Sequence, residues 1–469
     1  MKMGNSIKAV WSRVRNEPGF FLFLLLTAEV LYMGWAVCTK WYHIDSYIHN
    51  NPYDTFMDYF HMLRTAGTDH ASIYETKVIY PAFCFFLWSI LYHLIPAAYW
   101  DLDAFALRSL QQALFVFVML LVIMSVCIWE LLKKGYGRSG AEKALFALSM
   151  ILSGPMLSTI ERGNIILLAF VSALFFILYY RSEKKYLRYL SYAALAVSAS
   201  VKIYPALFGI LILERRRWKE AALAVLLGLL VFVLPFWEFG GVSSIITLFQ
   251  NIMEASPNLA NRGTNYNYSF ANLIKIIQIM SGSGMTAQSA ALKLIPIGMT
   301  GFIYLTGREE WKKAAAIVLF FIWVPEFSYT YALLFFILPF LLFLKSKEKL
   351  KAGDISYMLL FLLIFLPTAT AVFPQLDAPG APYPISVSVM ITNAGIVALG
   401  LLLTAEGIVN LIKGGGKKKR RRRKKKRKRS VKKRIKGKRR ERKKKVEEEG
   451  GLQKHEDQGI LEYDGKTVI

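Results

Sequence analysis

Asp54, Asp58 and His61 are spaced so that they could perform acid–base chemistry together. They lie in the segment YDTFMDYFHMLRTA, which follows Pro52 and has the apolar periodicity of a short amphipathic helix. Positions i, i+4 and i+7 share one helix face, so two carboxylates and an imidazole would point the same way. Such a group could take a proton from a hydroxyl, or it could hold a divalent cation. The alternative is a soluble cap helix whose acids merely face water.

These three residues belong to a polar segment, residues 45–80, between two strongly apolar stretches. The chain around it is 55% hydrophobic and repeats apolar runs of membrane-spanning size, which predicts an integral membrane protein and excludes a soluble enzyme. Three cysteines lie in apolar segments without metal-ligand or paired spacing. We therefore interpret the polar segment as an active-site loop outside the membrane.

The net charge of +27 is concentrated at one end of the chain. Residues 413–469 hold 27 Lys and Arg against 8 Asp and Glu, so they carry +19 and residues 1–412 carry +8. This divides the chain into a cytoplasmic N-terminus (1–19), a membrane domain (20–412, with the outer loop 40–78) and a polybasic tail (413–469). We expect the tail to be disordered, and its basic block, residues 413–445, to lie against anionic lipids of the inner leaflet. It offers no folded module for specific nucleic-acid binding.

Basic loops placed on the cytoplasmic side predict an all-α bundle in the cell membrane with about twelve crossings and both termini cytoplasmic. A full crossing by residues 79–97 would break this pattern, so we expect that run to dip into or lie along the outer interface. The two helices predicted for residues 189–200 and 203–213 are too short to cross a bilayer. Either they extend beyond these limits, or the pair forms a re-entrant loop. Residues 238–285 form a second long outer loop. The predicted spans are 20–39, 111–132, 144–155, 165–180, 189–200, 203–213, 221–237, 287–305, 314–324, 331–344, 356–373 and 385–412.

Two cationic residues at membrane depth suggest an anionic ligand. Lys202 lies at the apex of the short pair, just before Pro205, and a charge there costs about 2.5–3.5 kcal/mol unless it meets protein, water or an anion. A phosphate would suit a lysine beside a helix break. Arg162 and Asn164 follow Glu161 at the outer end of a span, where Arg can grip a phosphate or carboxylate by two bonds. The alternatives are a snorkelling lysine and a plain Glu–Arg surface pair.

Two outward-facing segments add aromatic residues. Tyr329 lies in PEFSYTY, and Arg262 lies in NLANRGTNYNYSF. Their aromatics could form a platform for a sugar, although tyrosines are also common at a membrane interface.

Four motifs together resemble glycosyltransferase family 87 of the GT-C superfamily. They are TFMDYF with its acid, SIYETKVIYPAFCFFLWSILYHLIP with a Tyr before a Pro-led helix, RGN at a helix start, and SVKIYPALFGILILERRRWKEA. The resemblance covers roughly residues 20–345, and the K-x-x-P segment before an apolar run and a basic turn is its most specific part. Some relatives carry a His in the outer turn where this chain has Ser328 and Tyr329.

The resemblance implies a GT-C-type membrane fold with juxtamembrane helices in the first outer loop. It also implies an inverting transfer of one sugar, mannose or a similar hexose or pentose, from a polyprenyl-phosphate donor to a lipid or cell-envelope glycan acceptor. Asp58 would be the general base, with Asp54 and His61 as second candidates. The implied phosphate-binding residues are Lys202, Arg162 and Asn164; the implied substrate-binding residues are Tyr80, Arg262 and Tyr329. No cofactor is implied, and a divalent metal is not expected, since one cationic side chain can neutralise one phosphate.

Two other functions fit part of this pattern. A transporter or flippase of lipid-linked sugars would also need cations at depth, but would not need an acid poised in an outer loop. A structural anchor for a partner of the tail would lose all function on deletion of residues 413–469.

Overall fold

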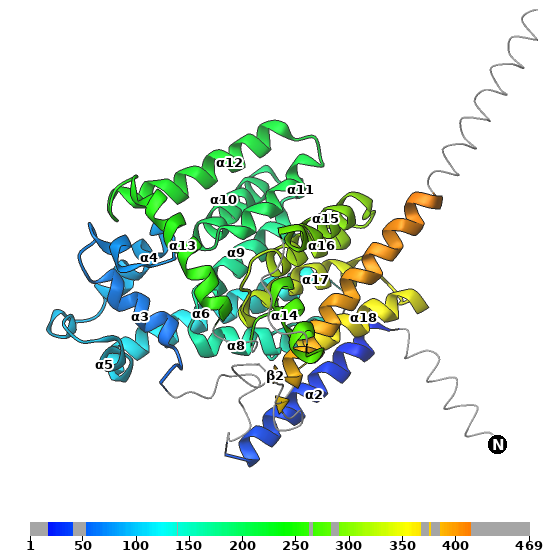
Figure 1. Ribbon diagram of the computed structural model, residues 1–469, viewed down its shortest axis with the longest axis horizontal. Helices are drawn as coiled ribbons and strands as arrows, with labels where there is room; N and C mark the ends of the chain where they lie inside the picture. The colour runs from blue at the N-terminus through cyan, green and yellow to red at the C-terminus, as the bar shows by residue number, and fades with distance from the viewer. Residues whose placement is uncertain are drawn as a thin grey trace, which may run out of the picture. The chain divides into compact units, whose positions relative to one another are not determined.

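The computed structural model describes residues 17–40, 53–137, 139–261, 266–282, 290–366, 375–376 and 385–413. These residues are almost entirely helical (Figure 1), which confirms the expected helical class. The one ladder joins the two-residue strands β1 (Gln375–Leu376) and β2 (Ile385–Ser386) in antiparallel register. The chain divides into a unit 1–405 and a unit 406–469, and the predicted role of the tail falls outside the described residues.

The helices follow one another with short connections. Their bounds are α2 Pro18–Cys38, α3 Met57–Ala66, η2 Ile73–Thr76, α4 Ala82–Tyr92, η3 Ala97–Tyr99, α5 Ala104–Ser109, α6 Gln111–Gly135, α7 Gly140–Ile151, α8 Gly154–Arg162, α9 Ile166–Tyr179, α10 Lys185–Val201, η4 Tyr204–Gly209, α11 Ile210–Leu213, α12 Trp218–Val233, η5 Leu234–Trp237, α13 Ser244–Asn261, α14 Phe270–Met280, α15 Ala290–Thr306, α16 Glu310–Trp323, η6 Thr330–Phe336, α17 Ile337–Ser346 and α18 Ala352–Phe365, followed by a last helix, Val387–Lys413.

Four helices among the described residues are long and apolar enough to cross a membrane: α2, α6, α12 with η5, and Val387–Lys413. The pair α7 and α8 makes a fifth if it is one span bent by 52°. Several shorter apolar helices accompany them. The protein is therefore a multi-pass helical membrane protein, whereas the number of twelve crossings stays a prediction.

Several boundaries differ from those predicted. α10 begins at Lys185, four residues earlier than expected, so the first arm of the short pair is 17 residues long. Residues 238–285 are not one long loop, because they contain α13 and α14. α4 has 11 residues, about 16 Å of helix, which is too short for a hydrocarbon core near 30 Å. Its length agrees with the expectation that residues 79–97 do not cross fully.

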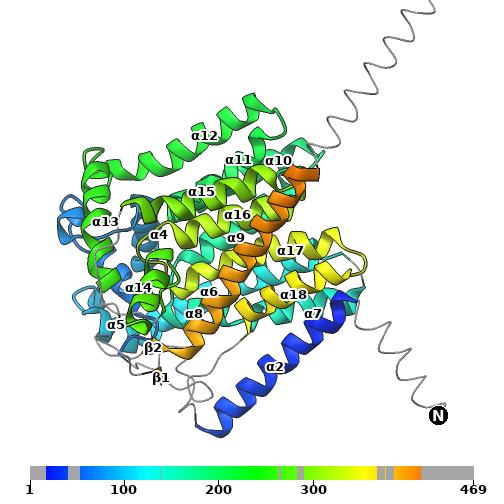
Figure 2. The same cartoon turned by 45° about the vertical axis from the view of Figure 1, so that its right-hand side comes forward.

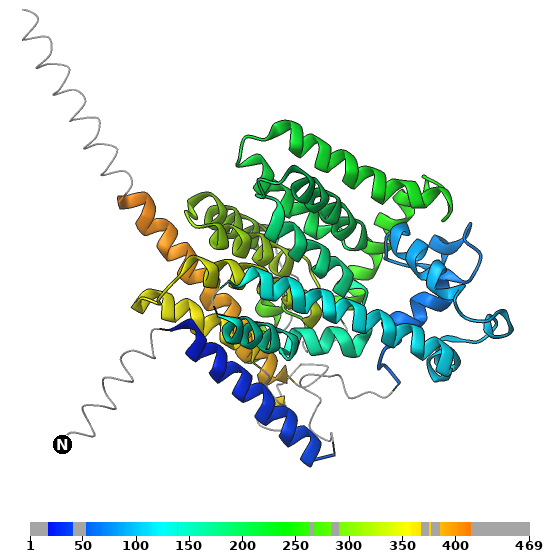
Figure 3. The ribbon, with the colours of Figure 1, turned by 180° about the vertical axis from the view of Figure 1, so that it is seen from behind.

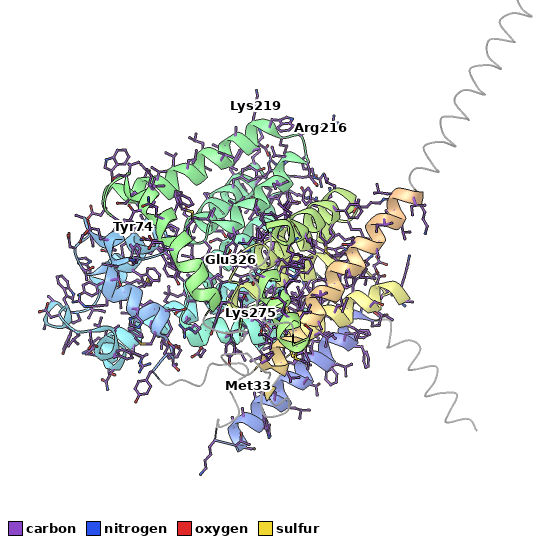
Figure 4. The ribbon with its side chains drawn as sticks, in the orientation of Figure 1. Met33, Tyr74, Arg216, Lys219, Lys275 and Glu326 are labelled. Atoms are coloured by element: carbon purple, nitrogen blue, oxygen red, sulfur yellow. The ribbon has the colours of Figure 1, made fainter. Side chains whose placement is uncertain are left out.

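The helices define two ends of the membrane unit. α3, α4 and α5 gather at one end, in Figure 1 and also in the opposite view of Figure 3. Figure 2 shows α2 along an outer edge, where it packs on α7. Figure 4 shows Arg216 and Lys219 at the start of α12 and Tyr74 near its other end.

Ion pairs connect the basic loops to one another at the end of the bundle opposite helices α3, α4 and α5. Arg181 pairs with Glu310, and Lys313 pairs with Glu214. Lys347 bridges Glu309 and Asp354 at 2.9 and 3.0 Å. Because each pair joins different helix connections, the network ties this end of the bundle together.

Candidate active site

The predicted helix after Pro52 exists but begins later than expected. α3 starts at Met57, after Phe56 in a left-handed conformation (φ 63°), so Asp54 lies in the preceding turn and not on the helix. The proposed i, i+4, i+7 face of Asp54, Asp58 and His61 is therefore wrong. A left-handed residue cannot continue a right-handed helix, and this reversal turns Asp54 back toward α8.

Asp54 and Asp58 nevertheless meet, because both bind Arg162. Arg162 Nη1 lies 2.7 Å from Asp54 Oδ2, and Arg162 Nη2 lies 2.6 Å from Asp58 Oδ1. Asn164 Nδ2 donates to the other oxygen of Asp58 at 2.8 Å. The Asp58 carboxylate is thus oriented by charge-assisted bonds on both oxygens.

The backbone fixes which way the Asn164 amide points. Asn164 Oδ1 accepts the backbone N–H of Ile166 at 3.0 Å, so its Nδ2 must face Asp58. The same Nδ2 lies 3.2 Å from Tyr80 Oη. Burial, and after it the charge of Asp58, raise the pKa of Tyr80 well above its ordinary value, so Tyr80 remains a neutral phenol. Asn164 consequently links Asp58 to Tyr80.

Gly163 allows α8 to end against the Asp54 turn. It has φ 62°, and a Cβ there would lie 3.0 Å from Tyr59 Cβ and 3.1 Å from the Phe56 carbonyl oxygen. The Phe56 N–H donates to the Glu161 carbonyl at 2.7 Å. Only glycine combines this backbone conformation with such a close approach, and the approach is what brings the two acids to Arg162.

Lys202 provides a second positive charge close to Asp58. It caps α10 in an extended conformation, and its Nζ lies 4.2 Å from the ring centroid of Tyr80 and 5.6 Å from that of Tyr331. The same Tyr80 lies 3.2 Å from the Asn164 amide that binds Asp58, so Tyr80 and Asn164 connect Lys202 to Asp58. Lys202 makes no hydrogen bond or ion pair with any residue that the structure describes. Cation–π contacts leave its N–H donors available to an anion.

A row of tyrosines lies beside Arg162. Tyr329 is 5.9 Å from Tyr266 and 5.0 Å from Tyr331, measured between ring centroids, and its hydroxyl interacts electrostatically with Arg162. Asn267 fixes this turn, because its Oδ1 accepts the Ser328 N–H at 3.0 Å. Tyr329 thus lies beside the other predicted residues.

Of the remaining predicted residues, His61 contacts a different part of the structure. His61 is exposed, and its ring packs 5.9 Å from that of Phe105 on α5. Arg262 lies outside the described residues. Tyr331 and Asn267 were missed, although Tyr331 lies in the same PEFSYTY segment as Tyr329 and Asn267 lies in the Arg262 loop.

Within the described residues, no group of three or more His, Cys, Asp and Glu side chains could hold a metal ion. The two carboxylates that might have formed such a group bind Arg162 instead.

The model of one family, glycosyltransferase family 87, matches residues 79–324, which is 246 of the 469 residues. The chain belongs to glycosyltransferase family 87. Among curated proteins and among solved structures, no match to it was found. The matched region of this family 87 protein contains Tyr80, Arg162, Asn164 and Lys202, whereas Asp58 precedes it. Family and fold together make the protein a multi-pass membrane glycosyltransferase.

Proposed function

We propose that this family 87 glycosyltransferase moves one sugar, mannose or a similar hexose or pentose, from a polyprenyl-phosphate donor to a lipid or cell-envelope glycan acceptor. One observation carries the proposal. Asp58, an oriented carboxylate, and Lys202, a lysine without an ion pair among the described residues, are brought together by Tyr80. The Tyr80 hydroxyl lies 3.2 Å from the Asn164 amide that binds Asp58, and the Tyr80 ring lies 4.2 Å from Lys202 Nζ. A carboxylate suits the acceptor hydroxyl, and a free ammonium suits the phosphate.

The proposed reaction is a single displacement with inversion, in a site of the GT-C type. The acceptor oxygen attacks the anomeric carbon, its proton passes to Asp58, and the bond from that carbon to the phosphate oxygen breaks. Each Asp58 oxygen has a second lone pair beyond the one that Arg162 or Asn164 uses, so the carboxylate can still accept a proton. The polyprenyl phosphate leaves with one more negative charge than it had in the donor.

The charges of the site favour Lys202 as the residue that meets this phosphate. Arg162 is already balanced by two carboxylates, Asp54 and Asp58, whereas Lys202 has no acidic partner among the described residues. We therefore assign Lys202 to the leaving group. The main role of Arg162 and Asn164 is to hold Asp58, and their contact with the donor phosphate would be an assisting one. With Lys202 supplying the compensating charge, the proposed reaction uses no metal.

Tyr80 and the tyrosines near Arg162 would form the walls around the sugar. Tyr80 and Tyr331 flank Lys202, and Tyr329 stands beside Arg162. Neutral phenol rings can stack on a sugar face, and their hydroxyls can bind its hydroxyls. Arg262 and His61 stay candidates for contacts with the acceptor.

The positions of the basic loops support an extracytoplasmic site in the cell membrane. α9 (Ile166–Tyr179) begins just after Asn164 and ends just before Arg181, and α10 (Lys185–Val201) leads back to Lys202. At 1.5 Å per residue these helices place the site roughly 20–25 Å from the basic loops. Basic loops prefer the cytoplasm, so the site would face outward. Both termini would be cytoplasmic, and residues 413–445 would contact anionic lipids of the inner leaflet.

The test is sugar transfer in proteoliposomes. Radiolabelled polyprenyl-phosphate sugars are offered with extracted membrane lipids to wild type, Lys202→Met and Lys202→Arg. We expect transfer by wild type from at least one donor, a 10²–10³-fold loss in Lys202→Met, as for removal of one group that stabilises transition-state charge, and partial recovery in Lys202→Arg. No transfer from any donor, with labelled lipid crossing the bilayer instead, would favour the flippase.

A further inference from the structure

The loops α9–α10 and α11–α12 form one basic surface at the end away from Asp58. Glu220 joins them, because its two oxygens bind Arg188 at 3.1 Å and Arg217 at 3.3 Å. Tyr192 donates a further hydrogen bond to Glu220 at 2.5 Å. These bonds hold the beginning of α10 beside the beginning of α12, next to the two loops, and occupy the Glu220 carboxylate.

Five cations of this surface keep no acidic partner. Lys184, Lys185, Arg215, Arg216 and Lys219 are exposed and make no ion pair with any described residue. The acids nearby are committed elsewhere: Glu220 as above, and Glu214 to Lys313. The exposed Glu183 is the exception. A cluster of unbalanced cations this close together raises the local positive potential and favours an anionic ligand.

Large aromatic side chains stand among these cations. Trp218 is 65% exposed at the first position of α12, and Tyr186 is 66% exposed in the first turn of α10. Trp and Tyr are enriched where a membrane protein meets the headgroup region.

An apolar ridge continues from this surface along α12. Val225 and Leu229 follow Trp218 at i+7 and i+11, on the same helix face, and are 62% and 56% exposed. Soluble anions gain nothing from such a ridge, but the acyl chains of a lipid do.

We propose that this surface, residues 181–190 with 213–220, binds the headgroup of an anionic phospholipid whose chains lie along α12. The lipid phosphate would sit among Arg215, Arg216 and Lys219, with Trp218 at the boundary between headgroup and chains. Figure 4 shows Arg216 and Lys219 together at that end of α12. The site belongs to the folded membrane unit and does not depend on the tail or on the reaction proposed above.

The experiment titrates dioctanoyl phosphatidylglycerol onto the full chain in a neutral detergent and follows hydrogen exchange in residues 181–190 and 213–220. The test variant is Arg215→Gln/Arg216→Gln/Lys219→Gln. Its charge-matched control, Lys134→Gln/Lys345→Gln/Lys349→Gln, removes three exposed cations at the end of α6, at the end of α17 and after α17. Of these, Lys349 also pairs with Glu17 at 3.6 Å. A local readout is needed because the tail, which is identical in all variants, also carries many cations.

We expect phosphatidylglycerol to slow exchange in both segments of wild type and of the control. Each lost cation weakens such binding roughly fivefold, so the midpoint in the test variant should rise on the order of 100-fold. Equal midpoints in all three proteins would overturn the proposal. So would equal protection by dioctanoyl phosphatidylcholine, or by glycerol 3-phosphate, which has the phosphate without the chains.

Discussion

Replacement of Asp58 by Asn tests the proposed general base with little change in shape. The Asp58 oxygens accept from Arg162 at 2.6 Å and from Asn164 at 2.8 Å. An Asn side chain has one oxygen and one NH₂ group, so one of these two donors would face another donor. Arg162 would keep its 2.7 Å ion pair with Asp54. We therefore expect Asp58→Asn to fold, with a cost of about 1–3 kcal/mol in the free energy of unfolding.

The effect on catalysis should be much larger than this structural cost. Loss of a positioned general base lowers kcat by about 10²–10⁴, which is about 3–5 kcal/mol of transition-state stabilisation. The assay measures kcat and KM for sugar transfer in proteoliposomes, with thermal unfolding of the same preparations. We expect the loss in kcat, with a smaller change in the KM of the donor, since Lys202 remains to bind the phosphate.

Asp54→Asn is the matched control. It removes the other carboxylate that binds Arg162. The Asp54 side chain is 35% exposed, against 20% for Asp58, and such partly exposed ion pairs contribute about 0–1 kcal/mol to stability. We expect less than a tenfold loss in kcat. If Asp54→Asn lost as much as Asp58→Asn, or if Asp58→Asn kept more than a tenth of the activity, the assignment of Asp58 as base would be refuted.

Three further changes test how the site and the basic end are held. Gly163→Ala should cost at least about 1–2 kcal/mol of stability and lower activity, because φ is 62° and its Cβ would press on the turn that carries Asp54. Asn251→Leu should lower activity and cost about 1–3 kcal/mol, since its buried amide donates at 2.8 and 3.0 Å to two carbonyls of the segment leading to Tyr80. Burial would raise the pKa of Glu309, but hydrogen bonds, first from Lys347, lower it to about 2. Because its pKa is lower in the folded state than in the unfolded state, ionised Glu309 stabilises the fold above about pH 4.5. This stabilisation is about 1 kcal/mol after allowance for the exposure of the side chain, and it is lost as the pH falls toward 2.

Each of these changes has a control of the same type. Gly228→Ala adds a methyl group to a helix position with open space around it and should stabilise slightly. Gln250→Leu changes an exposed neighbour of Asn251 and should leave kcat unchanged. Glu183→Gln removes an exposed acid that makes no ion pair with any described residue and is the control for Glu309→Gln. The Tm difference between Glu309→Gln and wild type should shrink between pH 5 and pH 2.5. Equal behaviour within any pair would contradict the corresponding contact.

The sequence predicted most of the apolar helices, and it singled out Asp58, Arg162, Asn164 and Lys202, which the structure brings together. Apolar runs and basic loops located most of the apolar helices to within several residues, because burial in lipid and the preference of Lys and Arg for the cytoplasm act on each segment separately. The exceptions are α13 and α14, which were predicted as a loop, and α18, which ends eight residues before the predicted span. The motifs around Asp58, Arg162 and Lys202 pointed to one family, and the family model confirms it. The amphipathic pattern also indicated a helix after Pro52.

Other features depended on contacts that no local pattern encodes. Phe56 is left-handed, so α3 begins only after it and Asp54 lies outside the helix. Helical periodicity alone cannot show such a reversal of the backbone. Residues 238–285 are polar enough to suggest a loop, yet α13 is stabilised there by packing against η2. His61 has the right spacing but the wrong surroundings, since it packs on Phe105.

What the sequence determined by itself was therefore the class of protein and the kinds of groups that its candidate site contains. Only the tertiary structure decided how they pair. Arg162 lies 104 residues from Asp58, and it binds both acids because Gly163 lets α8 approach the Asp54 turn closely. With Arg162 committed to these carboxylates, Lys202 is left without an ion pair among the described residues, which is why we propose it as the partner of a substrate phosphate. That division of roles follows from packing between distant segments.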